Sequence, residues 1–232
     1  MGSPLQVKRF AHTCTPFYET PMDPRFLPLG QEDSLRIFSS LPSEYHLEVD
    51  IGCNNGQLLV RLARSNPQKF FIGVELSFEL AREAVERLKH YGVKNAIVIG
   101  GDGRHVMAGG PGRNSLNAVH IYFPTPPPAT ENGGILLNRA FVEDTYRALK
   151  TLGTMRIATD DREYFHSACA LLDPRRWWEV PWSPPLDGLG QDSLVGSPWE
   201  NRHRREGRAI YSTQVLSLPD LGQRTEASDL PE

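Results

Sequence analysis

Apolar residues follow two different spacings along this chain. Short segments that are apolar at nearly every position recur between residues 46 and 158, and segments with apolar residues three and four positions apart lie between them. The first spacing is typical of strands buried on both faces, and the second is typical of amphipathic helices. Their alternation predicts the α/β class: a doubly wound, mostly parallel sheet of the seven-stranded type with helices on both faces.

Each element is placed by its own pattern. Strands are predicted at His46–Ile51, Phe70–Glu75, Ala96–Ile99, Ala118–Phe123 and Thr154–Ala158, and helices at Gln57–Ser65, 77–92, Arg139–Lys150 and Glu163–Leu172. Residues 208–218 alternate and predict a late strand at an antiparallel edge, whereas the Pro-, Gly- and Ser-rich residues 181–198 indicate a loop. One domain is therefore expected over 45–218. It lies between an irregular arm at 1–44, with a short helix near 33–40, and a flexible tail at 219–232.

Composition narrows the class of protein. The 232 residues carry a formal net charge of −3 with a pI near 6.2, so no general basic field attracts nucleic acid. Mean hydropathy is −0.40, and neither a membrane-length apolar run nor a signal peptide is recognised, so no membrane partner is expected. The three cysteines are odd in number and far apart, which favours a reducing cytoplasm. Cys14, Cys53 and Cys169 are widely spaced, so neither a metal centre nor a disulfide framework is predicted.

A tight turn follows the first predicted strand, in the segment VDIGCNNGQ. Gly52 and Gly56 flank it, and Asn54, which tolerates a positive φ, lies between them. Amide groups at the start of the next helix favour an anionic group there. The spacing lacks the G-x-G-x-x-G of dinucleotide sites and suits the shorter turn of S-adenosylmethionine (SAM) enzymes. Taken alone, a structural turn without a ligand explains it equally well.

Two carboxylates strengthen the ligand interpretation. Glu75 ends the second strand, where an acid can hold ribose hydroxyls, and Asp102 follows the third, where a carboxylate can accept the adenine amino group. Acids at the ends of consecutive strands beside the turn predict a SAM crevice, with S-adenosylhomocysteine (SAH) as the spent product. The predicted cofactor residues are Asp50, Gly52, Asn54, Gly56, Glu75, Leu76, Asp102, Gly103 and Tyr122.

Over residues 45–218 the chain resembles the tRNA (guanine-N7)-methyltransferase family. The matching segments are NPQKFFIGVEL, IYFPTPPP, RALKTLGTMRIATDDREY and SPWENRHRREGRAIY. The resemblance implies a Rossmann-like class I methyltransferase that methylates a guanine nitrogen. It also implies that Thr159-Asp160 corresponds to a Thr-Asp pair that contacts the guanine, and that Ser197, Trp199 and Glu200 correspond to a Thr-x-Phe-Glu segment that closes on it.

Two departures from the family pattern bear on the acceptor. After the fourth strand the family carries Phe-Pro-Asp-Pro-Trp, whereas this chain has Phe-Pro-Thr-Pro-Pro, so Thr125 replaces a carboxylate and Pro127 a tryptophan. The family continues with a run of basic residues that grips tRNA, whereas residues 128–134 contain none. Because phosphate contacts depend on Lys and Arg, tRNA binding should weaken unless other residues compensate. The one dense basic cluster left, Arg202, Arg204 and Arg205, is explained at least as well by a solvated edge turn as by an RNA grip.

The methyl group of SAM is already activated, so the enzyme mainly supplies proximity, alignment and a dry site. With Thr125 in place of the carboxylate, Asp160 and Glu200, helped by Asp161, are expected to orient the acceptor. The alternatives are a helix N-cap for Asp160 and a surface salt bridge for Glu200. Predicted catalytic residues are Asp160, Glu200 and Thr125; predicted substrate residues are Phe123, Pro124, Thr125, Thr159, Asp160, Asp161, Ser197, Trp199 and Glu200.

Three functions remain open at this point. The preferred one is an N-methyltransferase of a small purine-like or aza-heterocyclic acceptor, because the Phe-Pro-Thr-Pro-Pro segment is changed and the basic run is missing. The second is a tRNA guanine-N7 methyltransferase with a divergent loop. The third is a non-catalytic module that binds SAM or a partner. The chain is expected to be a monomer or a homodimer, and His120 is expected to be a hydrogen-bonded core histidine rather than a base.

Overall fold

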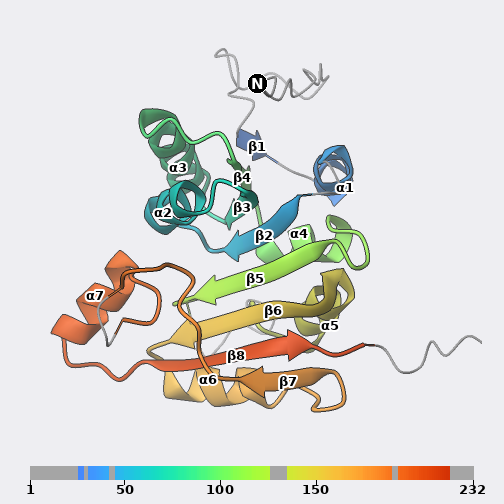
Figure 1. Ribbon diagram of the computed structural model, residues 1–232, viewed down its shortest axis with the longest axis vertical. Helices are drawn as coiled ribbons and strands as arrows, with labels where there is room; N and C mark the ends of the chain where they lie inside the picture. Colours follow the sequence, from blue (N-terminus) through green and yellow to red (C-terminus); the bar gives the residue numbers. More distant parts are fainter. Residues whose placement is uncertain (1–25, 29–30, 42–44, 126–134, 190–192, 220–232) are drawn as a thin grey trace, which may run out of the picture.

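The computed structural model describes residues 26–28, 31–41, 45–125, 135–189 and 193–219 (Figure 1). The strands are β1 (Phe26–Pro28), β2 (His46–Ile51), β3 (Lys69–Glu75), β4 (Ala96–Gly100), β5 (Leu116–Tyr122), β6 (Leu149–Thr159), β7 (Trp177–Val180) and β8 (Tyr211–Ser217). The helices are α1 (Gln31–Ser40), α2 (Gln57–Ser65), α3 (Phe78–His90), α4 (Gly103–Gly109), α5 (Arg139–Ala148), α6 (Arg162–Cys169) and α7 (Pro198–Arg205). Within the described residues, the strands form one eight-stranded sheet in the order β1-β4-β3-β2-β5-β6-β8-β7.

The direction of the strands locates the site. Strands β1 to β6 are parallel, β8 is antiparallel to β6, and β7 is antiparallel to β8. The carboxyl ends of β2, β5 and β6 therefore point to the same side of the sheet, and α7 lies on that side (Figure 1). Open α/β sheets bind ligands at the carboxyl ends of their strands, so this edge is where a site is expected.

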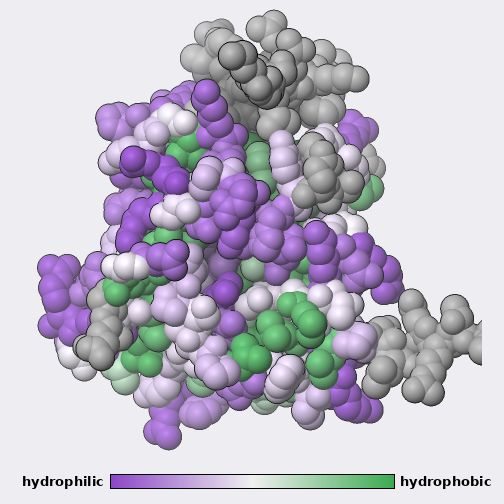
Figure 2. Space-filling model, viewed as in Figure 1, coloured by the Kyte–Doolittle hydropathy of each residue, from purple (hydrophilic) through white to green (hydrophobic). Residues whose placement is uncertain are grey.

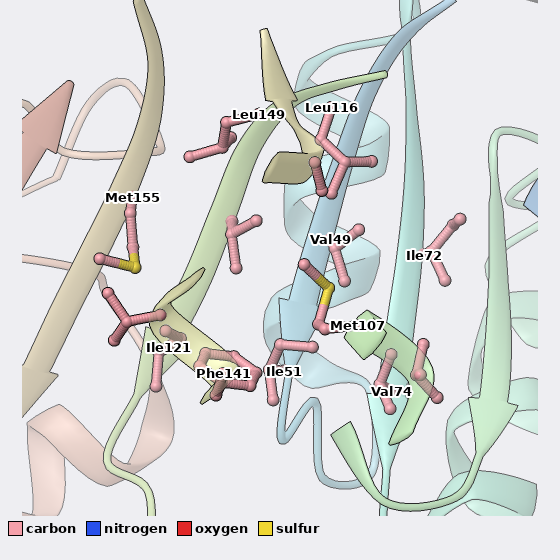
Figure 3. Close-up of a cluster of buried hydrophobic side chains, with 14 of the residues drawn as sticks. Val49, Ile51, Ile72, Val74, Met107, Leu116, Ile121, Phe141, Leu149 and Met155 are labelled. Carbon is pink, nitrogen blue, oxygen red and sulfur yellow. The ribbon is translucent and has the colours of Figure 1, made fainter. Parts of the chain in front are cut away.

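Both faces of the sheet are buried, which explains the almost continuous apolar runs of the strands. One cluster joins Val49, Ile51 and Ile72 to side chains of α1, α4, α5 and α6. Figure 3 shows Met107 of α4 and Phe141 of α5 within it. A second cluster, on the opposite face, joins Phe71 and Val98 to α2, α3 and part of the chain between residues 182 and 195. The predicted doubly wound α/β class is thus confirmed, and β1 extends a seven-stranded core.

The expectation of an irregular arm at 1–44 is wrong for part of its length. Strand β1 pairs with β4, and α1 packs on α4 with Ile37 and Phe38 in the core. The short helix expected near 33–40 is therefore α1, and its apolar face belongs to the domain. The rest of the arm, at 1–25, 29–30 and 42–44, lies outside the described residues, as do residues 220–232 of the predicted tail.

The carboxyl-terminal part also differs from the prediction. The late strand β8 is not at the edge, because the four-residue strand β7 pairs with its free side. Strand β6 begins at Leu149, immediately after α5 ends at Ala148, and helices α4 and α7 were not expected. These elements are too short for a hydrophobic period to identify them. None of the described helices combines the length and apolarity needed to cross a membrane.

Candidate active site

A cavity of about 320 Å³ opens at the carboxyl ends of β2 and β5. The turn after β2 forms one wall, the end of β5 forms another, and α7 forms the third. The lining residues are Asp50, Gly52, Cys53, Asn54, Asn55, Gln57, Leu58, Tyr122, Phe123, Ser197, Pro198, Trp199, Arg202 and Arg205. This cavity brings together predicted cofactor residues from the turn and predicted substrate residues from β5 and α7.

The turn after β2 has the predicted left-handed geometry. Gly52, Asn54 and Gly56 have φ angles of 81°, 49° and 75°, so the asparagine does occupy a positive-φ position. A Cβ atom on Gly56 would lie 2.9 Å from the Cβ atom of Ala84, so the glycine also permits α2 to start close to α3. No side chain caps the start of α2, which leaves amide groups at this helix terminus available to a ligand.

Asp50 is the most unusual group in the cavity. Its side chain is buried, and its Oδ2 atom has no hydrogen-bond partner among the described residues. Burial, together with the nearby charge of Glu75, raises the pKa of Asp50 to about 7. An unpaired carboxyl group in a buried position is costly unless a ligand satisfies it, and a cation is the natural partner. Sequence reasoning placed Asp50 in the cofactor set without detecting this property, which arises from the sheet around it.

Glu75 connects the turn after β2 (residues 52–56, the predicted cofactor turn) to the start of α3. Its Oε2 accepts the amide hydrogen of Asn54 at 2.9 Å, and its Oε1 accepts that of Ser77 at 2.9 Å. The carboxylate therefore lies at the predicted strand end and fixes the turn. Leu76, which follows it, is 69% exposed. Ribose binding by Glu75 remains a prediction, because neither residue lines the cavity described above.

Asp102 caps α4 and is already paired. Its carboxylate accepts hydrogen bonds from the backbone and the guanidinium of Arg104, including one of 2.6 Å, and this pairing lowers the pKa of Asp102. An adenine amino group would have to share this carboxylate with Arg104. Gly103 is buried, and a Cβ atom there would lie 2.7 Å from Ile51 Cγ2, so its position reflects the close approach of α4 to β2.

The end of β5 supplies the aromatic wall. The Tyr122 hydroxyl lies 2.8 Å from His120 Nδ1, and His120 Nε2 lies 2.8 Å from Glu48 Oε2. His120 is completely buried and hydrogen-bonded, as expected for a core histidine. Phe123 has a φ of 52°, unusual for an aromatic residue, and its amide donates to the Ala158 carbonyl at 2.7 Å.

The predicted substrate residues around β5 and β6 do not all reach the cavity. Pro124 is half-buried and Thr125 is exposed, and both follow Phe123 without lining the cavity. The segment without basic residues, 128–134, lies outside the described residues. Thr159 is fully buried, and its hydroxyl accepts the amide hydrogen of Asp161.

Asp160 and Asp161, at the end of β6, have different surroundings. Asp161, not Asp160, caps α6 by accepting the amide hydrogen of Tyr164 at 2.8 Å. Asp160 instead accepts a hydrogen bond from Arg208 at 2.7 Å. The helix-cap alternative for Asp160 is therefore wrong, and its carboxylate lies beside α7 without lining the cavity.

Helix α7 carries the predicted segment Ser197, Trp199 and Glu200. Ser197 caps the helix by accepting the amide hydrogen of Glu200, and Trp199 is 43% exposed at the cavity. The predicted salt bridge with a neighbouring arginine forms, because Arg204 donates to Glu200 at 2.9 Å, but Glu200 is completely buried, so the predicted surface position is wrong. The signal Ser-Pro-x-Glu is a recognisable helix start that sequence reasoning did not use.

The Glu200 carboxylate organises the segment before α7. It accepts the amide hydrogens of Leu194, Val195 and Gly196 at 2.6 to 2.8 Å. Burial opposes its ionisation, but these amides and Arg204 outweigh burial and lower the pKa of Glu200. With its oxygens occupied in this way, Glu200 is better placed to shape α7 than to contact an acceptor. Arg202 and Arg205 were singled out only as part of a basic cluster and His203 not at all, since the helix that brings them to the cavity was not foreseen.

Comparisons with known proteins are consistent across the same region. The sequence model of a family described as "Putative methyltransferase" matches residues 44–213. A tRNA (guanine-N(7)-)-methyltransferase of Rubrobacter xylanophilus is 32% identical over 181 residues, which cover 73% of this chain and 76% of that protein. A protein of the same name from Helicobacter pylori is 28% identical over 170 residues, but these cover 73% of this chain and only 42% of that longer protein.

Solved structures share the fold. The crystal structure of a methyltransferase from Streptococcus mutans, titled as putative and in complex with SAH, matches with a TM-score of 0.50. Its sequence is 13% identical, and the match covers 81% of this chain and 97% of that chain. At this identity the likeness concerns the architecture: a mostly parallel sheet with helices on both faces.

Proposed function

This chain belongs to the methyltransferase family that includes the tRNA (guanine-N(7)-)-methyltransferases, and on that premise we propose that it methylates N7 of a guanine in tRNA. It is a SAM-dependent methyltransferase, so the acceptor is the open question. The observation that carries the proposal is the cavity itself, in which the cofactor turn faces an aromatic wall and the basic helix α7. The small-heterocycle hypothesis rested on the missing basic loop, and the relatives give it no support.

The residues at the turn fit SAM. The cofactor supplies an activated methyl group on a sulfonium. The buried Asp50 carboxyl, unpaired among the described residues, would hold its ammonium group, and the free amides at the start of α2 would hold its carboxylate. Glu75, at the next strand end, remains the candidate for the ribose. Tyr122 and Phe123 would exclude water from the reacting atoms.

The acceptor side suits a nucleobase next to a phosphate backbone. Phe123 and Trp199 offer flat apolar surfaces to a base, and Arg202 and Arg205 line the same cavity. Base stacking on an aromatic side chain is worth about 1–3 kcal/mol. Arg202 pairs with Glu206, but Arg205 has no carboxylate partner among the described residues. Figure 2 shows strongly hydrophilic side chains gathered over α7, at the left of the molecule.

A transfer assay tests the proposal. The protein is incubated with labelled SAM and unmodified tRNA, and separately with guanine-like heterocycles. Label on a guanine of tRNA, recovered as 7-methylguanosine after digestion, is the expected result. Transfer to the heterocycles alone would instead support the small-acceptor hypothesis. SAM binding without any transfer would favour a non-catalytic module.

Replacing Asp50 with asparagine should change the pH dependence of stability. In the folded chain the carboxyl is neutral below about pH 7, whereas in the unfolded chain it ionises above about pH 4. The folded state therefore binds more protons in this window, and stability falls as pH rises through it. Urea unfolding without cofactor should show this fall in the wild type and a smaller fall in Asp50→Asn.

The same substitution should weaken SAM binding roughly tenfold or more, because a charge-assisted hydrogen bond to the ammonium is removed. Calorimetry at pH 8 measures this. An unchanged affinity would remove Asp50 from the cofactor site.

Replacing Arg202 and Arg205 together with glutamine should reduce the salt dependence of tRNA binding. Because the loop after β5 lacks basic residues, the wild-type slope of log K against log salt should itself be shallow. The slope should fall by roughly 0.7 to 0.9 for each phosphate that an arginine no longer neutralises. Filter binding across a salt series measures the slope, and Arg175→Gln, an exposed arginine paired with Asp173, is the matched control. An equal slope in the double variant would place the RNA contacts elsewhere.

A further inference from the structure

His203 contacts both Phe123 and Trp199, the aromatic residues at the end of β5 and on α7. Its ring centroid lies 5.3 Å from that of Phe123, with an interplanar angle of 31°, and 6.0 Å from that of Trp199, with an angle of 24°. Phe123 and Trp199 both line the cavity, whereas His203 is buried and does not. A single ring on α7 thus contacts the end of β5 and its own helix at the point where an acceptor base would stack.

The free ring nitrogen of His203 faces a carboxylate at the end of a third element, β6. His203 Nδ1 is buried without a hydrogen-bond partner among the described residues, and Asp160 Oδ2 lies 3.5 Å away. Glu206 Oε2 is at 4.0 Å. An unpaired buried ring nitrogen is unfavourable, so a carboxylate beside it is a stabilising neighbour. Arg208 donates to the same Asp160 oxygen at 2.7 Å and holds that carboxylate next to the ring.

The backbone of Phe123 needs such support. A φ of 52° is a strained conformation for an aromatic residue, and strain of this kind persists only where the surroundings impose it. The amide of Phe123 is held by the Ala158 carbonyl of β6, two residues before Asp160, and its ring is held by His203. The end of β6 therefore contacts Phe123 in two ways. The Ala158 carbonyl accepts its amide hydrogen, and Asp160, which follows the strand, lies beside the His203 ring that packs on Phe123.

We propose that His203, aligned by Asp160, is a positioning residue that sets where the rings of Phe123 and Trp199 lie for stacking of the acceptor base. The inference rests on the proposed function and deepens it. Stacking surfaces accept any base, so the placement of the rings decides how the base is presented to the methyl group. Asp160, which does not line the cavity, then acts through His203, and this role differs from the sequence-based hypothesis that Asp160 is catalytic.

Steady-state kinetics with tRNA separates this role from a purely structural one. His203→Ala should raise the KM for tRNA roughly tenfold, the size of one stacking interaction, with a smaller change in kcat. His203→Phe, which keeps a flat ring, should restore part of the affinity. Asp160→Asn alone should raise the KM for tRNA, but the double variant should have the same KM as His203→Ala, because the effects of coupled residues are not additive. SAM affinity should stay at the wild-type level, and Arg162→Gln, an exposed neighbour of Asp160, is the matched control.

Additive effects of the two substitutions, or equal decreases of tRNA and SAM affinity, would overturn the inference. A second measurement does not depend on the acceptor: the emission of Trp199, taken as the difference between each protein and its Trp199→Phe version. It should change in His203→Ala and also in Asp160→Asn, and unchanged emission in Asp160→Asn would overturn the alignment. If the wild type transfers no methyl group to tRNA, the proposed function fails, and this emission still decides the inference.

Discussion

Glu48→Ala is expected to lower the free energy of unfolding by about 3–5 kcal/mol, the range for breaking a buried ion pair. Glu48 is 4% exposed in the middle of β2. Its carboxylate contacts His120 Nε2 at 2.8 Å, and Lys69 Nζ and His46 Nε2 each at 2.9 Å. Burial opposes ionisation of Glu48, but His120 and Lys69 outweigh it and hold its pKa well below the usual range. Removing the carboxylate leaves the buried His120 without this acceptor.

Urea unfolding followed by circular dichroism measures the decrease. The matched control is Glu86→Ala, because Glu86 pairs with Lys89 on the exposed surface of α3 and should change stability by no more than about 0.5 kcal/mol. The contribution of Glu48 is present above its unfolded pKa and disappears as pH falls towards its folded pKa, so the stabilities of the wild type and Glu48→Ala should converge in acid. A decrease below about 1 kcal/mol at pH 7 would mean that solvent reaches the pair.

The pair of Glu48 and His120 is also connected to the cavity. His120 links Glu48 to the Tyr122 hydroxyl, and Tyr122 lines the cavity. A chain of polar contacts therefore runs from the surface at Lys69 across β2 and β5 to the cavity wall. Glu48→Ala should accordingly lower activity as well as stability, with the effect on activity transmitted through His120 and the Tyr122 hydroxyl.

Sequence reasoning succeeded where structure is local and periodic. The runs around Val49 and Phe71 identified buried parallel strands, because a strand covered on both faces has no polar side. The left-handed position of Asn54 followed from the residue type and its place between two glycines. In each case the spacing of neighbouring residues carries the information.

Sequence reasoning failed where residues distant in sequence decide the burial and the pKa of a side chain. Asp50 gains its raised pKa from burial in the sheet and from Glu75, and neither is visible in the segment that contains it. Glu200 is buried because the preceding segment folds back over it, and a charged residue in an Arg-rich stretch gives no sign of that. His203 acts through contacts with Phe123 and Asp160, which come from two other strands. Burial and pairing across the sheet are properties of the assembled fold.

Glu200→Ala is expected to have the largest effect on activity, lowering kcat/KM for tRNA roughly a hundredfold, since a misplacement of about 1 Å can cost that much. The substitution removes the acceptor of three amide hydrogens in the segment that leads into α7. Two of these hydrogen bonds are buried, and each group left unpaired costs about 1–3 kcal/mol. The segment should loosen, and with it Trp199, Arg202 and Arg205, which α7 presents to the cavity.

The expected pattern distinguishes an organising role from the catalytic role that the sequence suggested for Glu200. Stability and kcat/KM should fall together in Glu200→Ala, and Glu200→Gln, which keeps one acceptor oxygen, should lie between it and the wild type in both. SAM affinity should change little, because the cofactor turn belongs to β2 and α2. Glu163→Gln, an exposed acid at the start of α6, is the control. A Glu200→Gln protein with wild-type stability and no turnover would instead assign the carboxylate to the reacting base, since the substitution would then have removed a direct interaction with the base without loosening the segment.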